Sequence, residues 1–489
     1  MRFRPLLLSA ILGSCVIATG VAADTNRLNV LFLISDDLRP ELGCYGSQLA
    51  KTPNLDALAA SGVRFDRAYC QFPLCNPSRS SMLNIRSPTV AGVLGNRAYF
   101  RDAHPDWVTL PQLFKNNGYA TLRTGKIYHG GTDDLPSWTE GGDPRRNTGE
   151  GALRVLDPDD IMFIQNPPKK TKAAPDEAEL TQAQRSDRWI MLEGDGESHG
   201  DYKCADRAID FLRRYQDKPF FLACGFVKPH SPPTAPKKFF DKWDADKIPL
   251  PPDFAPRPTV PPGFPTAAIR PKNADLFIGR DASEKEAREM IRAYLASSAW
   301  VDWLTGRVLA ELDKLGLREK TIIVFWGDHG YQLGEKGKWS KAGSLFEAGD
   351  RVPFIIVPPK GKANGQTCER IVQALDFYPT LAELCGLTPP KEIEGRSLVP
   401  LLNNPRAEWN HPAFTVWSED GKTLHGIAVR TEKYRYAEFG ERAKNGAMLF
   451  DEAADPHEMK NLADDPKFAG TRKELSRWVN DYRTSLAQP

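Results

Sequence analysis

The chain has 489 residues, which at roughly 100–200 residues per domain allows two to four domains and at least one large buried core. Apolar residues make up 41% and charged residues 26%, a composition that excludes a disordered or low-complexity protein. The 65 Lys and Arg residues balance 63 Asp and Glu residues, so the chain has no overall basic field and we expect no nucleic-acid partner.

The first 23 residues have the pattern of a cleaved secretory signal. Arg2 and Arg4 precede an apolar run over residues 5–17, and the segment ends in Val-Ala-Ala. We therefore predict a signal peptide over 1–23 and an exported protein, periplasmic or secreted. The alternative is a lipoprotein cleavage box, Leu-Gly-Ser-Cys, with a lipid on Cys15. No later stretch approaches about 20 apolar residues, so no transmembrane segment is expected.

Two continuous apolar runs, residues 29–34 and 321–326, predict strands buried on both faces of a parallel sheet. The first run leads into Asp36 and Asp37, and the second leads into Asp328. Ligands of open α/β sheets bind at the carboxyl ends of the strands, so we expect these three aspartates to converge. Further strands of the same sheet are predicted over 219–226 and 353–357.

The clearest predicted helix begins at Ser283, which has capping-box spacing to Glu286. Apolar residues then recur every three or four positions as far as Leu315, and Gly316 follows. Helices alternating with buried strands predict a layered α/β fold. Shorter helices are predicted over 54–61, 110–116, 203–216 and 376–385.

Two segments, 165–188 and 249–271, lack the pattern of packed elements. The second has nine prolines in 23 residues, which excludes a helix or a central strand. Long loops in a compact α/β domain often form the rim of a binding site, and we interpret both segments in this way.

The C-terminal part of the chain changes character. Residues 413–417, 426–431 and 434–439 alternate like short antiparallel strands, and a terminal helix is predicted from about Arg472. We place a domain boundary near Pro405, which gives a catalytic domain over 24–405 and a C-terminal subdomain over 406–489.

The most specific motif is Cys-Asn-Pro-Ser-Arg, residues 75–79, followed by Ser80 and Ser81. In an oxidising compartment Cys75 could pair with Cys70 across a short loop. Seven cysteines remain without Cys15, and setting Cys75 aside leaves six that could all pair, in 15 possible ways. Alternatively, Cys-x-Pro-Ser-Arg is the pattern by which sulfatases are recognised, in which the cysteine is oxidised to formylglycine after synthesis.

The chain resembles the formylglycine-dependent sulfatases, most closely their iduronate-2-sulfatase branch. Motifs that match this branch follow one another in order over most of the mature chain. Besides the cysteine motif they are Ser-Asp-Asp-Leu-Arg-Pro at 35–40, Thr-Gly-Lys-Ile-Tyr-His at 124–129, Lys-Pro-His at 228–230, Asp-His-Gly at 328–330 with Trp-Ser-Lys at 339–341, and Leu-Phe-Asp at 449–451.

This resemblance implies an alkaline-phosphatase-like fold: a large mixed, mostly parallel sheet flanked by helices, with a smaller C-terminal α+β subdomain of antiparallel strands. It also implies one Ca²⁺ ion. Asp36, Asp37 and Asp328 offer hard oxygen ligands, which select Ca²⁺ or Mg²⁺ over zinc. Residue 75 and His329 would complete the metal site, although many sulfatases have Asn at the position of His329.

The resemblance further implies that a maturation enzyme oxidises Cys75 and that the hydrated formylglycine attacks sulfur. Arg79 would stabilise the formylglycine hydroxyl and the metal-binding carboxylates. Lys126 and Lys341 would bind the sulfate oxygens, on which charge develops in the transition state.

Two histidines would move protons in this mechanism. His230 is expected to protonate the departing sugar oxygen, and His129 to take the proton from the second hydroxyl so that sulfate leaves. Gly125-Lys126 does not belong to a phosphate-binding loop, because the Gly-x₄-Gly-Lys-Ser/Thr pattern is absent.

The implied substrate is a sulfated saccharide, with a 2-O-sulfated uronic acid of a glycosaminoglycan or related polysaccharide as the specific expectation. Two alternatives remain open at this point. One is a phosphonate or phosphate monoester hydrolase of the same superfamily. The other is an inactive glycan-binding protein in which Cys75 stays a thiol.

Overall fold

The structure is a computed structural model that describes residues 27–143 and 187–486. The predicted signal peptide, Cys15 and nearly all of segment 165–188 lie outside these residues. A membrane-spanning helix needs about 20 largely apolar residues, and none of the helices in the described ranges meets that requirement.

Within the described residues, seven strands form one sheet in the order β3-β5-β1-β7-β8-β2-β9. The strands of the β3-β5-β1-β7 half run parallel, and so do β2 and β9, whereas β8 runs antiparallel to both of its neighbours. The predicted mixed, mostly parallel sheet is confirmed. The strand bounds are β1 Asn29–Asp36, β2 Val63–Tyr69, β3 Ala120–Gly125, β5 Phe220–Pro229, β7 Thr321–Gly327, β8 Arg351–Val357 and β9 Gln366–Gln373.

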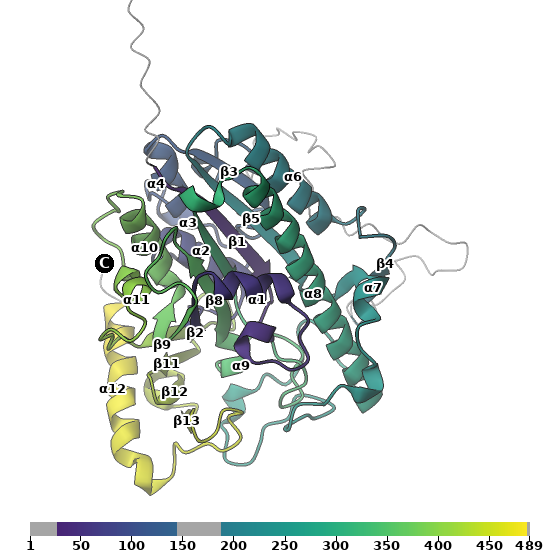
Figure 1. The fold of residues 1–489 in the computed structure, drawn as a ribbon. Helices are drawn as coiled ribbons and strands as arrows, with labels where there is room; N and C mark the ends of the chain where they lie inside the picture. The colour runs from purple at the N-terminus through teal and green to yellow at the C-terminus, as the bar shows by residue number, and fades with distance from the viewer. Residues whose placement is uncertain (1–26, 144–186, 487–489) are drawn as a thin grey trace, which may run out of the picture.

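Helices cover both faces of this sheet (Figure 1). Alternate residues of β1 enter opposite cores, because Val30 and Phe32 pack on one side and Leu31 and Leu33 on the other. One core includes α2 Cys75–Asn84, α3 Phe100–Ala103, α4 Leu110–Asn116, α10 Phe377–Leu384 and α11 Val399–Asn403. The other includes α1 Pro53–Ala60, α6 Gly200–Tyr215, α7 Lys237–Phe240 and α8 Glu284–Lys314.

The long helix α8 begins as predicted. The Ser283 Oγ accepts a hydrogen bond from the Glu286 N–H at 3.3 Å, and the Glu286 carboxylate accepts one from the Ser283 N–H at 3.0 Å. Helix α6 begins three residues before its predicted start, at Gly200. The proline-rich segment 249–271 has no α-helix or strand, and its regular structure is a single 3₁₀ turn, Thr266–Ala268.

The described C-terminal residues form a second, antiparallel sheet in the order β10-β11-β12-β13, which confirms the predicted subdomain type. Helix α12 lies beside this sheet (Figure 1) and shares its apolar core. The domain boundary near Pro405 stays a prediction. The bounds are β10 Ala413–Trp417, β11 Gly426–Arg430, β12 Tyr434–Phe439, β13 Ala447–Asp451 and α12 Ala469–Ser485. Elsewhere in the described residues, two short strands pair with each other, β4 Ile190–Leu192 and β6 Thr234–Pro236.

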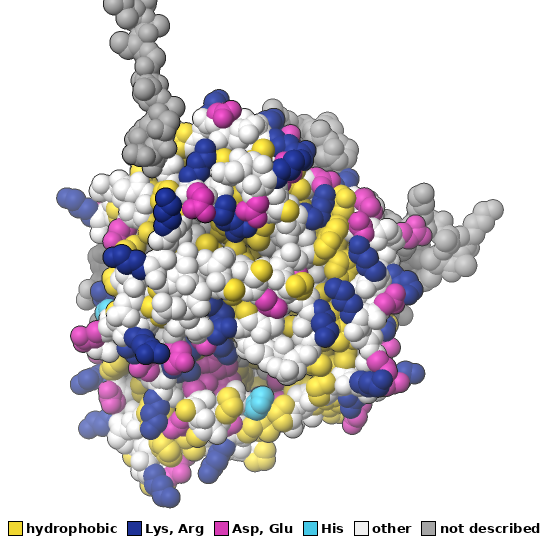
Figure 2. Space-filling view, in the orientation of Figure 1, with side chains coloured by type: hydrophobic (Ala, Val, Ile, Leu, Met, Phe, Trp, Pro, Cys, Tyr) yellow, Lys and Arg dark blue, Asp and Glu magenta, His cyan; other side chains and the backbone are white. Residues whose placement is uncertain are grey.

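None of the possible disulfide pairings is formed in the described residues, in which every cysteine is a free thiol. Cys70 continues from β2, where its N–H donates to the Asp350 carbonyl, whereas the Cys75 Sγ faces Asp36. The two thiols therefore belong to different environments despite their short separation in sequence. On the face drawn in Figure 2, basic and acidic side chains are interspersed, in keeping with the balanced composition.

Candidate active site

Three aspartates meet where β1 and β7 end. These strands are parallel neighbours with Ser35 opposite Gly327, so Asp36, Asp37 and Asp328 emerge at the same edge of the sheet. All three side chains are fully buried, and the Asp37 N–H donates to the Asp328 Oδ1 at 3.0 Å. The convergence predicted from the two apolar runs is confirmed.

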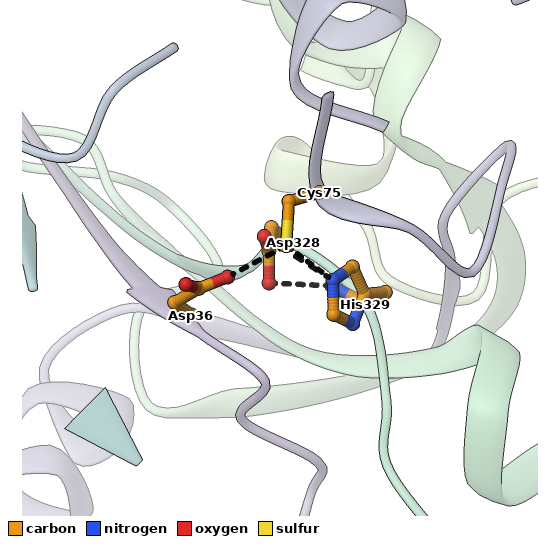
Figure 3. Close-up of side chains that lie close together, drawn as sticks. All are labelled: Asp36, Cys75, Asp328 and His329. Carbon is orange, nitrogen blue, oxygen red and sulfur yellow. Dashed lines mark hydrogen bonds and ion pairs between the residues drawn. The ribbon is translucent and has the colours of Figure 1, made fainter. Parts of the chain in front are cut away.

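Cys75 is the first residue of α2 and points at these aspartates. Its Sγ lies 3.4 Å from the Asp36 Oδ1 and 3.4 Å from the His329 Nε2, as Figure 3 shows. The side chain is 1% exposed. The sequence analysis did not predict this helix, because its polar residues carry no apolar periodicity. The helix is buried along its whole length, which fixes Cys75 at the strand ends.

Arg79 lies one turn after Cys75 on α2 and joins two of the aspartates. Its Nε is 2.8 Å from the Asp328 Oδ2, and one terminal nitrogen is 3.4 Å from the Asp36 Oδ1. The other terminal nitrogen donates to the backbone carbonyls of Lys126 and Ile127, the latter at 3.1 Å. The buried guanidinium thus connects α2, β1, β7 and the loop after β3.

Two lysines from different segments pair with the aspartates. The Lys126 Nζ pairs with the Asp36 Oδ2, and the Lys341 Nζ lies 2.9 Å from the Asp37 Oδ2 and 3.5 Å from the Asp275 Oδ2. Burial acts to raise the pKa of Asp36, but Lys126 holds the pKa of that carboxyl well below its ordinary range. Both ammonium groups are therefore held beside Cys75 as charged groups.

Each predicted histidine also lies at this site. The His329 Nδ1 is 3.0 Å from the Gly330 carbonyl, which can only accept, so Nδ1 carries the proton and Nε2 faces the aspartates. The His230 Nδ1 is likewise 2.8 Å from the Ser231 carbonyl. His129 has a buried Nδ1 with no hydrogen-bond partner among the described residues, and burial lowers its pKa.

The acidic groups fit a divalent cation. Asp36, Cys75, Asp328 and His329 each direct a possible ligand atom to within 4.8 Å of one another. The buried Asp37 Oδ1 accepts no hydrogen bond from the described residues. Burial raises the pKa of Asp328 to about 7 despite the nearby Arg79, so the carboxylates need further positive charge to ionise together. Such an oxygen-rich donor set suits Ca²⁺ or Mg²⁺.

The structure also reveals residues that the sequence analysis did not assign. The Lys228 Nζ donates to the His230 and Pro232 carbonyls, both at 2.9 Å, and so shapes the turn that carries His230. Its place in the Lys-Pro-His motif was a usable signal. Asp275, which pairs with Lys341, belongs to no recognisable pattern and could be found only from the structure.

Comparisons with known proteins agree with this arrangement. Residues 28–387 match the family model described as Sulfatase, and residues 334–485 match N-sulphoglucosamine sulphohydrolase, C-terminal. Iduronate 2-sulfatase of Mus musculus is 31% identical to this chain, with 89% of each protein covered.

Solved structures show the same fold. A protein in complex with its substrate D-glucosamine-2-N,6-O-disulfate has a TM-score of 0.69 at 23% identity, with 94% of this chain and 98% of that chain covered. The phosphonate monoester hydrolase of Agrobacterium radiobacter has a TM-score of 0.72 at 22% identity, with 94% and 96% covered. The family match over most of the chain shows that it belongs to the sulfatases, the enzymes that hydrolyse sulfate esters.

Proposed function

We propose that this protein is an exported sulfatase that removes sulfate from a sulfated sugar, specifically a 2-O-sulfated uronic acid of a glycosaminoglycan or related polysaccharide. The observation that carries the proposal is the buried thiol of Cys75 at the start of α2, enclosed by three aspartates and by cations from three segments. The 31% identity to iduronate 2-sulfatase supports the choice of sugar.

The metal in this proposal is Ca²⁺. Asp36, Asp37, Asp328, His329 and residue 75 would hold it. Possible ligand atoms of Asp36, residue 75, Asp328 and His329 lie within 4.8 Å of one another, and the Asp37 Oδ1 lies 3.4 Å from the His329 Nε2. When bound, the ion supplies positive charge that favours ionised ligands and an ionised nucleophile.

Residue 75 is the nucleophile. Oxidised to formylglycine by a maturation enzyme and hydrated, it supplies two hydroxyls on one carbon, one for attack on sulfur and one for the later release of sulfate. Arg79 holds the position of residue 75 relative to the aspartates, because its guanidinium already bridges Asp36 and Asp328.

The other basic residues bind the substrate and move protons. Lys126 and Lys341 pair with Asp36 and Asp37 beside the nucleophile and would hold the sulfate oxygens, where negative charge develops. His230 would donate a proton to the sugar oxygen. His129, neutral because burial lowers its pKa, would accept the proton of the second hydroxyl.

The experiment that tests this function measures release of sulfate from a 2-O-sulfated uronide and of phosphonate from an aryl phosphonate monoester by one preparation. The phosphonate hydrolase comparison supports only a shared fold at 22% identity, so the two activities must be compared directly. We expect a higher kcat/KM for the sulfate ester. Preference for the phosphonate ester, or no hydrolysis of the sulfate ester by protein in which mass spectrometry finds residue 75 converted to formylglycine, would refute the proposal.

A further inference from the structure

Lys338 has a buried charge that nothing in the described residues neutralises by direct contact. It lies between β7 and α9 Glu347–Asp350 and is 1% exposed, yet its Nζ makes no hydrogen bond to a described residue. The neighbouring lysines of the same loop are both paired, Lys336 with Asp253 at 2.7 Å and Lys341 with Asp37 at 2.9 Å. A buried, unpaired ammonium is costly, so its retention indicates a missing anion.

Arg270, at the end of the proline-rich segment, is the charged residue that acts most strongly on the Lys338 pKa. Burial and the Arg270 charge together lower the Lys338 pKa to about 8. One terminal nitrogen of Arg270 lies 2.6 Å from the Glu419 Oε1, and both side chains are partly exposed. The guanidinium stacks over Trp417 at 5.6 Å. We call Lys338 and Arg270 the outer cationic pair.

Gly343 allows this close packing. A Cβ at this position would lie 2.8 Å from the Arg270 Cδ and 3.4 Å from the Trp417 Cε2, and its φ of +75° disfavours other residues. The Arg270 stem therefore lies directly on the loop backbone, two residues after Lys341.

Two routes of contact connect the outer cationic pair to the nucleophile. Trp417, under Arg270, packs on Phe72 with ring centroids 5.3 Å apart, and Phe72 precedes Cys75 by three residues. On the other route, Asp275 lies 3.5 Å from Lys341 and also acts on the Lys338 charge. The pair thus lies on the Lys341 side of the active site.

We propose that the outer cationic pair binds a second anionic group of the substrate, a uronic acid carboxylate or a second sulfate, while Lys126 and Lys341 hold the sulfate that is removed. This inference rests on the proposed function. The Arg270 guanidinium contacts the anion with two parallel hydrogen bonds and exchanges Glu419 for it. The buried Lys338 ammonium adds positive charge to the site.

The test uses matched substrates that differ only in the second anion. One pair is a 2-O-sulfated uronide and its carboxyl-reduced counterpart, and the other is glucosamine 2-N,6-O-disulfate and glucosamine 6-O-sulfate. Since a hydrogen bond to a charged group contributes about 1.5–3 kcal/mol, we expect Arg270→Gln to raise KM about 10- to 100-fold for the substrate that carries the recognised anion. The KM of its partner and kcat for both should stay within about twofold. The substrate pair that responds identifies the anion.

Further variants separate recognition from folding. Lys338→Met should raise the same KM without lowering the unfolding midpoint, because no ion pair is lost. Glu419→Gln should lower that KM, since it removes the carboxylate that the substrate displaces. Arg257→Gln, an exposed arginine of the same segment paired with Asp281, should change neither value.

Equal effects of Arg270→Gln on both members of each substrate pair, or a higher KM in Glu419→Gln, would overturn the inference. The failure of the proposed function is a different result. In that case the parent enzyme releases no sulfate from either 2-O-sulfated uronide, whatever its activity on the two glucosamine sulfates. A parent that hydrolyses all four equally well keeps its function as a sulfatase and shows that the outer cationic pair has no such role.

Discussion

The Arg79 side chain contacts three separate segments of the chain although it stands only four residues after Cys75. The four-residue spacing on a helix places both side chains on the same face of α2. Its nitrogens reach Asp328 at 2.8 Å, the Ile127 carbonyl at 3.1 Å and Asp36 at 3.4 Å. A lysine has one nitrogen and could not make these contacts together. Arg79 therefore fixes where residue 75 stands relative to the strand ends.

Replacing Cys75 tests the proposed nucleophile. We expect Cys75→Ser and Cys75→Ala to reduce steady-state sulfate release to background, because neither residue can carry two hydroxyls on one carbon. The serine variant could be sulfated once, so at most one equivalent of product should form in a rapid-quench experiment.

The control for these variants is their fold. Serine and alanine are smaller than cysteine and leave the contacts of Arg79 unchanged, so near-parental unfolding midpoints are expected. Multiple turnovers by Cys75→Ser at a rate near that of the parent would show that the formylglycine mechanism is incorrect.

His230→Ala separates proton donation from charge stabilisation. A sugar alcohol is a poor leaving group, so losing a general acid should slow hydrolysis of a sugar sulfate by about 10²- to 10⁴-fold. An aryl sulfate with an acidic phenol should be affected much less, because its phenolate leaves without a proton. The measurement is kcat/KM for both substrates.

Lys126→Ala provides the comparison for His230→Ala. Lys126 is proposed to act on the sulfuryl group, so its loss should slow both substrates to a similar degree. Equal losses on both substrates for His230→Ala would exclude it as the acid and make Lys341 the next candidate.

Helix α6 shows how one element positions the active site from a distance. Its N-cap is His199, whose Nδ1 accepts a hydrogen bond from the Asp201 N–H at 3.0 Å. The Asp201 carboxylate accepts hydrogen bonds from the N–H groups of Val227 and Lys228 at 2.9 and 2.8 Å. The first turn of α6 thus holds the end of β5, which leads into His230.

This cap predicts a pH-dependent stability. Burial lowers the pKa of His199 to about 3, below its ordinary value near 6.5. The unfolded chain binds more protons than the folded one between these values, so the free energy of unfolding should fall as pH is lowered from about 6.5 toward 3. His199→Asn keeps a capping acceptor without titrating. Urea unfolding from pH 7 to 4 should show a shallower decline for the variant, and parallel curves would contradict the prediction.

At the scale of the whole molecule, the sequence predicts best those parts that are buried on both sides. The apolar runs of β1 and β7 have every residue buried, and their pattern is unambiguous. Strand β2 was not predicted because Arg64 and Asp66 interrupt its apolar residues and are only partly buried. Those charged side chains pair with each other at 2.8 Å, a contact that no periodicity reveals.

The candidate site was predictable for a different reason. Its residues lie in short motifs at strand and helix ends, and these motifs can be recognised in the sequence whatever residues the intervening loops contain. Asp275 and Arg270 lie in such a loop, so their nearness to Lys341 and Lys338 depends on how the proline-rich segment packs. The count of cysteines left their pairing open, because a disulfide needs a specific geometry that a count does not contain; even Cys204 and Cys224, with Sγ atoms 3.6 Å apart, are free thiols.

Metal binding should stabilise the whole molecule, because the proposed ligands join β1, β7 and α2. Ca²⁺ at 100 times its dissociation constant should add about 2.7 kcal/mol to the free energy of unfolding, and a chelator should remove it. Asp328→Asn should abolish both the shift and sulfate release. Asp281→Asn, at an exposed ion pair, should retain both. Elemental analysis checks the metal, and stoichiometric zinc in active protein would contradict the proposed site.

The burial of Cys75 also determines when residue 75 can be oxidised relative to folding. A thiol that is 1% exposed, on a helix enclosed along its whole length, is out of reach of another enzyme once the chain has folded. If residue 75 is oxidised as proposed, the maturation enzyme must act on the nascent or unfolded chain, in competition with folding. The fraction of active molecules in a preparation then depends on the rate of oxidation relative to the rate of folding. Chains that fold first keep an unmodified thiol, and adding the maturation enzyme afterwards cannot activate them.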